Sequence, residues 1–168
     1  MKIFLQTIII VFLFLFTQSC KKDKSTNNPT SSYFKIGTTI YPLANASYVV
    51  DTANGFSVIL ITSPGLIFNL SNNSATGSGN YIEFDIDAID PILAPGTYYS
   101  PIGFDGFIGL NCSVTNNYIG NEYGQDYTQP GSLAISKSNS TYTVDFQFTL
   151  DAGQLVKGQF IGPITKSY

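Results

Sequence analysis

TYTVDFQFTL, residues Thr141 to Leu150, carries the clearest structural pattern in this 168-residue chain. Its large apolar side chains occupy every second position, at Tyr142, Val144, Phe146, Phe148 and Leu150. Polar side chains fill the positions between them. Because successive side chains of a strand point to opposite faces of a sheet, this alternation predicts a β-strand with one packed and one solvated face.

Segments of similar composition follow one another from Tyr33 to the C-terminus. The predicted strands are FKIGTTIYPL, SYVVDT, FSVILIT, LIFNLS, YIEFDIDAI, TYYSPI, FIGLNCSV, SLAIS, TYTVDFQFTL and QLVKGQFIGPI, and none shows a helical period. FSVILIT is apolar on both faces, which is typical of a central, covered strand. The clusters NNSATGSGN and DAG indicate chain reversals. The pattern predicts one all-β domain, residues 33–168, folded as an antiparallel β-sandwich, with a closed, lipocalin-like β-barrel as the alternative.

Two glycines interrupt the apolar face of the last predicted strand. Gly158 and Gly162 fall on the same face as Val156 and Phe160. A glycine inside a strand marks a bend or a place where a neighbouring group comes close. We therefore expect an aromatic ring or a bend at these two positions.

YIEFDIDAID, residues 81–90, places the carboxylates Glu83, Asp85 and Asp87 on alternate positions. The residues between them are apolar, so the acidic side chains are expected on the polar outer face of a half-buried strand. Such a stripe also discourages pairing with other sheets. One strand face does not surround a calcium ion with six to eight oxygens, so no metal site is predicted. A calcium site that uses Glu83, Asp85, Asp87 or Asp90 would need further ligands from loops.

EFDIDA, within the same stretch, resembles the E-x-D-x-x-E signature of the laminarinase and lichenase glycoside hydrolases. The resemblance implies a nucleophile at Glu83 and a supporting carboxylate at Asp85. Alternate residues of a strand lie about 6.6 Å apart, which is within the range that glycosidase carboxylates use. The acid/base position holds Ala88, and the chain has no Trp to line a sugar cleft. Glycoside hydrolysis is therefore the least favoured alternative, and no catalytic residue is predicted.

The composition excludes several other chemistries, because the chain has no His and all eight of its basic residues are Lys. The usual general base, imidazole metal ligands and a bidentate anion clamp are thus missing. No glycine loop that could cradle a cofactor phosphate follows a strand, so no cofactor is predicted. From Tyr33 onward four Lys face ten Asp and Glu, a net charge of 4 − 10 = −6, which excludes nucleic acid as a partner.

The N-terminus has the pattern of a secretory signal. Lys2 precedes an unbroken apolar run from Ile8 to Phe16, and small polar residues then lead to Cys20. A membrane-spanning helix needs about 20 apolar residues, more than this segment provides. Residues 1–19 are therefore predicted to be a signal peptide.

FTQSCKKDK, residues Phe16 to Lys24, resembles the cleavage region of bacterial lipoproteins, particularly those of the Bacteroidota. The resemblance implies cleavage before Cys20, acylation of that residue and attachment to the outer membrane, on either of its two sides. Thr17 and Gln18 depart from the commonest residues of this family. Two or more acyl chains anchor a protein stably. Residues 20–32 are almost free of apolar side chains and are predicted to be a lipidated flexible tether.

Cys112 is the second and last cysteine of the chain. With Cys20 acylated, no intramolecular disulfide can form, so the exported domain must rely on its core. Cys112 lies in the apolar stretch FIGLNCSV and is expected to be a small buried hydrophobic residue.

NNYIGNEYGQDYTQPG, residues 116–131, is long, polar and rich in tyrosine, a composition typical of contact loops. A neutral glycan or a protein strand could stack on the aromatic rings and bind the polar side chains. The candidate ligand-binding residues are Tyr118, Tyr123, Tyr127, Asn121, Glu122, Gln125 and Asp126. The alternative is an ordinary solvated loop whose tyrosines lie on the sheet.

The C-terminal half resembles a pattern found in small Bacteroidota lipoproteins, on the segments PGTYYS, GSLAIS, TYTVDFQFTL and GQFIGPI. This resemblance implies an exported all-β module without a known activity. The sequence therefore predicts a membrane-anchored, non-catalytic binding or structural module at the cell envelope. A carrier of a small apolar ligand, built on a barrel, is the alternative.

Overall fold

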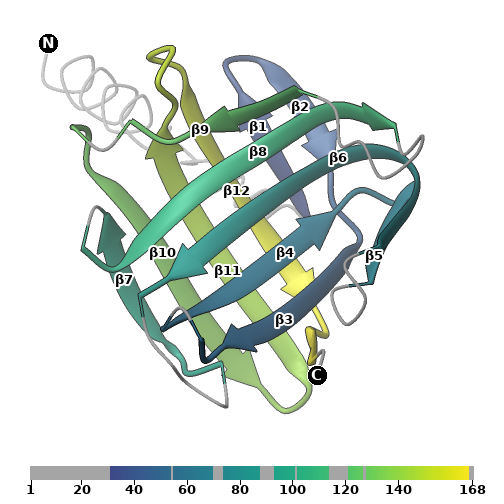
Figure 1. Ribbon diagram of the computed structural model, residues 1–168, viewed down its shortest axis with the longest axis vertical. Helices are drawn as coiled ribbons and strands as arrows, with labels where there is room; N and C mark the ends of the chain where they lie inside the picture. Colours follow the sequence, from purple (N-terminus) through teal and green to yellow (C-terminus); the bar gives the residue numbers. More distant parts are fainter. Residues whose placement is uncertain are drawn as a thin grey trace, which may run out of the picture.

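The computed structural model consists of two mostly antiparallel β-sheets that pack face to face (Figure 1). The sheets do not close into a barrel, so the predicted β-sandwich is confirmed and the barrel alternative is wrong. The structure describes residues 31–53, 55–69, 74–87, 93–100, 102–113, 121–126 and 128–166. The predicted signal peptide and Cys20 lie outside these ranges. Within the ranges, no helix has the length and apolar character needed to cross a membrane.

The first sheet, which we call sheet A, has the strand order β2-β1-β12-β11-β10-β7. In chain order these strands are β1 (Tyr33–Ile36), β2 (Thr39–Pro42), β7 (Gly96–Ser100), β10 (Gly131–Ser138), β11 (Thr141–Thr149) and β12 (Leu155–Gly162). Ser32 ties the start of the domain to β12, because its hydroxyl donates to the carbonyl oxygen of Ile161 and accepts from the N–H of the same residue.

The second sheet, sheet B, has the order β13-β3-β4-β6-β8-β9, and β5 pairs with β6 beside this path. Its strands are β3 (Asn45–Asp51), β4 (Phe56–Thr62), β5 (Leu66–Asn69), β6 (Ser74–Ile86), β8 (Phe104–Ser113), β9 (Asn121–Gly124) and β13 (Thr165–Lys166). β13 joins β3 in parallel. β2 and β9 are thus edge strands of the two sheets.

Most predicted strands appear where the alternation placed them. TYTVDFQFTL forms β11, whose apolar side chains are buried between the sheets, and FSVILIT forms β4 in the middle of sheet B. Three segments differ from the prediction. FKIGTTIYPL is a hairpin that turns at Gly37, which has a φ of 58°. Ser74 to Asn80, expected to be a turn, belongs to the long strand β6, and part of the predicted tyrosine-rich loop is β9.

The main core lies between the two sheets and is rich in phenylalanine. The ring of Phe84 in sheet B contacts the rings of Phe146 and Phe148 in sheet A, with centroids 5.1 and 6.1 Å apart. The rings need glycines beside them, since a Cβ on Gly158 would lie 2.7 Å from the ring of Phe146. A Cβ on Gly162 would lie 2.9 Å from the Phe160 ring, so the predicted close approach of rings is confirmed at both glycines.

A smaller second core covers part of the outer face of sheet B. There β5 lies over the sheet and buries a cluster that consists of Leu60, Leu66, Tyr81 and Cys112, with Phe68 packed against it. Cys112 has only 1% of its surface exposed, which confirms the prediction of a small buried hydrophobic residue. The cover is fastened through Ser63, whose hydroxyl accepts a hydrogen bond from the N–H of Asn80 at 2.9 Å. The outer face of sheet B is therefore partly shielded from water.

Candidate functional site

The predicted contact loop lies at the edge of sheet B. Its residues 121–124 form β9, which pairs with residues 107–110 of β8. Tyr118 and Tyr127 lie outside the described residues, and for Asn121 only its place at the start of β9 is described. Tyr123, Glu122, Gln125 and Asp126 can be placed individually, and they fall in different environments.

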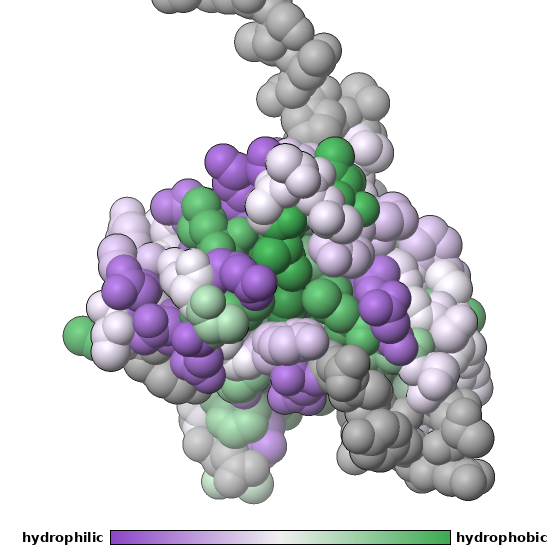
Figure 2. Space-filling model, turned by 90° about the horizontal axis from the view of Figure 1, so that it is seen from above, coloured by the Kyte–Doolittle hydropathy of each residue, from purple (hydrophilic) through white to green (hydrophobic). Residues whose placement is uncertain are grey.

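Tyr123 faces the space between the two sheets, because it pairs with the inward-facing Ile108. Its side chain is 40% exposed and lines a pocket of about 400 Å³ between the edges of the sandwich. The pocket, which we call the end pocket, is lined by Ile36, Thr39, Tyr41, Leu110, Tyr123, Leu150, Ala152 and Gln154. Figure 2 shows apolar side chains gathered in the centre of this end of the molecule, with polar side chains around them.

Glu122 points to the outer face of sheet B, where its Oε2 accepts a hydrogen bond of 2.8 Å from the hydroxyl of Tyr81. Asp126 accepts two hydrogen bonds from Thr128, one from the hydroxyl at 2.6 Å and one from the backbone N–H at 2.8 Å. These bonds, that of the hydroxyl first, lower the pKa of Asp126. Both carboxylates thus stabilise local structure.

Gln125 is fully buried and holds three segments together. Its Oε1 accepts a hydrogen bond from the N–H of Gly106 at 3.0 Å, and its Nε2 donates to the hydroxyl of Ser100. Its backbone forms a bridge with Leu150 at the end of β11, which links the two sheets. Gln125 was predicted to be a ligand-binding residue, but this burial leaves its amide out of reach of a ligand. A polar residue in a polar stretch gives no sequence signal for such a role.

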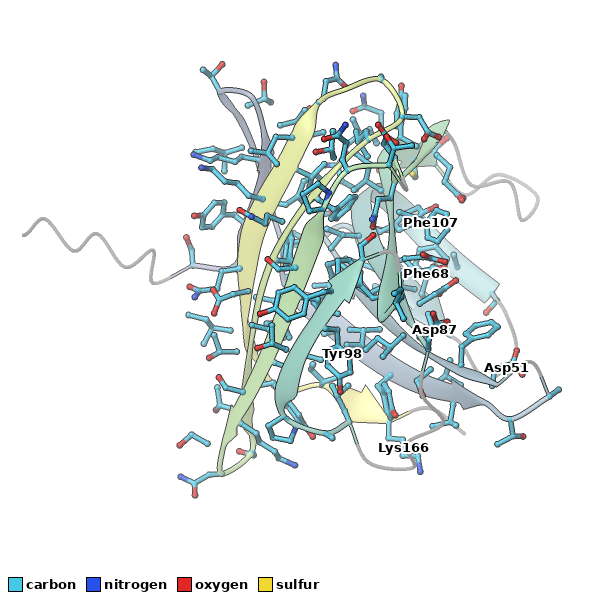
Figure 3. All side chains as sticks on the ribbon, turned by 90° about the vertical axis from the view of Figure 1, so that its left-hand side faces the viewer. Asp51, Phe68, Asp87, Tyr98, Phe107 and Lys166 are labelled. Carbon is cyan, nitrogen blue, oxygen red and sulfur yellow. The ribbon has the colours of Figure 1, made fainter. Side chains whose placement is uncertain are left out.

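The three alternate carboxylates share the outer face of sheet B, as their spacing predicted. They were expected to be solvated, and this is correct only for Asp87, which is exposed. Figure 3 shows Asp87 and Phe107 on the side of sheet B that points away from sheet A. Glu83 lies between Leu60 on β4 and Phe107 on β8, which are its partners in the register. Burial beside these groups, followed by the charges of Asp85 and Glu122, raises the pKa of Glu83 to about 7.

Asp85 has a second carboxylate directly opposite on β8, Asp105. Burial, followed by the charge of Asp105, raises the pKa of Asp85 to about 6. Burial and the charge of Asp87 also raise the pKa of Asp105. One oxygen of Asp85, Oδ1, is covered and has no hydrogen-bond partner among the residues that the structure describes. Glu83 and Asp85 line one side of a hollow of about 510 Å³ that also contacts Phe56.

A metal ion does not fit this carboxylate group. No set of three His, Cys, Asp or Glu side chains in the described ranges is arranged to hold a metal. The side chains lie along a sheet face and do not converge from several directions, as calcium ligands must.

A second hollow, of about 500 Å³, lies on the outer face of sheet A and was not predicted. Its side chains come from β1, β12, β11 and β10, which are consecutive in the sheet. The polar and charged lining residues are Tyr33, Lys35, Ser132, Asp145, Gln147, Lys157 and Gln159. These residues are far apart in sequence, so only the strand order brings them together.

Comparisons with known proteins identify no relative. No family model matches the chain, and no curated protein or solved structure matches it. The resemblance around Cys20 to bacterial lipoproteins therefore stays a prediction. The candidate sites depend on their geometry alone.

Proposed function

We propose that the chain is an exported lipoprotein, anchored to the outer membrane through Cys20, whose β-sandwich is a non-catalytic binding module of the cell envelope. The signal-like residues 1–19 and the SCKKD string support the anchor. The end pocket supports the binding role. The domain faces either the periplasm or the medium. A glycan or a protein is a second class of partner, besides the ligand of the end pocket.

The observation that carries the binding role is the composition of the end pocket. Small-molecule sites are concave, mostly apolar and supplied with a few polar groups, and roughly 300–1,000 Å³ is their usual volume. The end pocket has about 400 Å³, apolar walls from Ile36, Leu110 and Leu150, and a hydroxyl on Tyr123. It fits a small apolar or aromatic ligand with one polar group. This ligand class does not require a closed barrel.

Binding can be tested by nuclear magnetic resonance with the mature domain and three probes, indole, 2-naphthol and decanoic acid. We expect shift changes in the backbone signals of residues 110, 123 and 150. Ala152→Phe fills the pocket from the turn between β11 and β12 and should abolish these changes. Ala53→Phe, at an exposed turn elsewhere, is the matched control. Shift changes scattered over the surface, or unchanged in Ala152→Phe, would contradict this site.

The anchor has its own test. Cells that express the chain are labelled with radioactive palmitate, and we expect incorporation that Cys20→Ala abolishes. Cys112→Ala is the control, since the buried thiol of Cys112 cannot be acylated in the folded domain. Equal labelling of wild type and Cys20→Ala would exclude the anchor while leaving the end pocket untouched.

Hydrolysis of a glycoside at Glu83 and Asp85 is a second candidate, favoured by one observation. Glu83, with a pKa of about 7, lines a hollow beside Asp85, and a carboxyl that is protonated near neutral pH can act as a general acid. The pKa values of the two groups are both raised, however, whereas glycosidases separate those of acid and nucleophile. Reducing-sugar assays on laminarin and lichenan, with Glu83→Gln as the control, should show no release. Release that Glu83→Gln abolishes would establish the enzyme.

A further inference from the structure

The outer face of sheet A presents two parallel rows of side chains. The register across β1, β12, β11 and β10 aligns Lys35, Lys157, Gln147 and Ser132 in one row. The neighbouring row consists of Tyr33, Gln159, Asp145 and Ala134. Opposite residues of adjacent strands have Cβ atoms about 5 Å apart, so each row is a continuous line of groups. The small residues on β10 leave the hollow above them.

Lys35 and Lys157 stand directly opposite each other in this hollow. In the part of the chain that the structure describes, neither ammonium group has an ion pair or a hydrogen bond. Like charges directly opposite in a sheet destabilise it. The hollow thus holds two ammonium groups and one carboxylate, that of Asp145, on a domain whose net charge is 4 − 10 = −6. A bound anion would relieve the repulsion between the two lysines.

The groups beside the lysines are suited to hydroxyl groups. Gln147 and Ser132 provide donors and acceptors, and Tyr33 provides a ring at the side of the hollow. Asp145 is held in place by Gln159, whose Nε2 donates a hydrogen bond of 2.6 Å to its Oδ1. All of these side chains project from paired strands, so their spacing is fixed. A ligand that matches this arrangement carries an anionic group on a ring with several hydroxyls.

We infer that the outer face of sheet A binds an acidic saccharide, whose carboxylate pairs with Lys35 and Lys157. The hydroxyls of the sugar bind Gln147 and Ser132, and its ring face lies against Tyr33. The hollow of about 500 Å³ is within the usual range for such ligands. Two lysines are too few for the continuous phosphates of a nucleic acid, and the amide groups would be unused by a simple anion.

The experiment uses the mature domain and isothermal titration with three probes: an oligogalacturonate, the neutral cellohexaose and polyglutamate. We expect the oligogalacturonate to bind most tightly and its affinity to fall as salt rises. Lys35→Gln combined with Lys157→Gln should weaken this binding about tenfold or more. Lys137→Gln, which removes an exposed lysine outside the hollow, should leave it unchanged and is the matched control.

Each other outcome overturns the inference. Absence of oligogalacturonate binding, equal binding of cellohexaose, or unchanged binding by the double variant would exclude the acidic saccharide. Polyglutamate that binds as tightly would show a site for charge alone and would favour an acidic protein partner. The end pocket lies elsewhere in the molecule, so these failures leave the proposed binding of a small apolar ligand intact. In the same way, a failure of the end-pocket experiment leaves the acidic-saccharide site intact.

Discussion

The outer faces of the two sheets carry the same kind of electrostatic conflict and resolve it differently. In sheet A, Lys35 and Lys157 are directly opposite each other, and in sheet B, Asp85 and Asp105 are. Lysine has a long stem that lets its ammonium group reach water. Aspartate has a short one, and the carboxylate of Asp85 is half-buried. The lysine pair is therefore open to a ligand, whereas burial and mutual repulsion raise the pKa values of Asp85 and Asp105.

The difference between the faces comes from what covers them. Over sheet B lie β5 and the ring of Tyr81, and Phe107 stands beside Glu83. Glu83 and Asp85 are both half-buried. In the described residues nothing comparable covers the hollow of sheet A, whose lining is mostly polar. The strands of both sheets show similar alternation in sequence. The outer face of sheet B is nevertheless acidic and partly covered, whereas that of sheet A has an open hollow with two lysines.

The largest expected effect is the loss of the cover on sheet B through Tyr81→Ala. The Tyr81 ring lies over Gly109, where a Cβ would come within 2.0 Å of it, and it packs edge-on against Phe68 with centroids 5.7 Å apart. Removal of a buried aromatic ring costs about 3–5 kcal/mol. We expect urea unfolding to show a loss of this size.

Tyr99→Ala is the matched control on the outer face of sheet A, because Tyr99 is 65% exposed. Its free energy of unfolding should change by no more than about 0.5 kcal/mol. An equal loss of free energy of unfolding in Tyr81→Ala and Tyr99→Ala would show that the outer faces of sheets A and B are equally exposed to water.

The alternation in the sequence predicts which face of the sheet each residue occupies, but not how deeply each polar side chain is buried. The packed face of β11 and the burial of β4 follow from local patterns, since apolar spacing alone determines which face packs. The desolvation of Glu83 depends on Phe107, which is 24 residues away and becomes a neighbour only through the order β6-β8. The same holds for Gln125, whose partners Ser100 and Gly106 come from other strands. Pairing between distant strands is not encoded in any single segment.

The second effect in size concerns pH. Burial raises the pKa of Glu83 from 4.5 to about 7, so the folded state holds a proton that the unfolded state has already released. Stability from this group is thus greatest below about pH 4.5 and is lost as the pH rises to about 7. Glu83→Gln removes the cost of the buried charge. We expect it to raise the free energy of unfolding at pH 8 by about 2 kcal/mol, and to leave it nearly unchanged at pH 4.

The measurement is urea unfolding of wild type and Glu83→Gln at pH 4, 6 and 8. Gln147→Glu, which adds a carboxylate to the exposed hollow of sheet A, is the control and should show little change with pH in this range. The difference in free energy of unfolding between Glu83→Gln and wild type is compared at pH 4 and pH 8. An equal difference at both would show that the carboxylate of Glu83 is solvated, and the outer faces of the two sheets would then not differ in cover.

Asp85→Asn should have a smaller effect of the same sign. Burial, followed by the charge of Asp105, raises the pKa of Asp85 from 3.8 to about 6, but solvent screens a part of this repulsion. We expect a gain of about 0.5–1 kcal/mol at pH 8 and no gain at pH 3.5. Asp145→Asn on sheet A should not stabilise the domain, since its Oδ1 accepts a hydrogen bond from Gln159. Destabilisation by Asp85→Asn at pH 8 would contradict the repulsion between Asp85 and Asp105.

The smallest expected effect tests the lysine pair without a ligand. Lys35→Gln removes the repulsion with Lys157 across β1 and β12, and a like-charge pair on a sheet costs a few tenths of a kcal/mol. The variant should be more stable than wild type by about 0.3 kcal/mol at 10 mM salt, and this gain should vanish near 1 M salt, where the screening length falls to about 3 Å. Lys137→Gln should not show the gain, because the ammonium of Lys137 lies 4.6 Å from the ring centre of Tyr142, an attractive contact. A gain that persists at 1 M salt would assign the effect to packing, and the charge pair would then no longer explain why this face stays open to an anion.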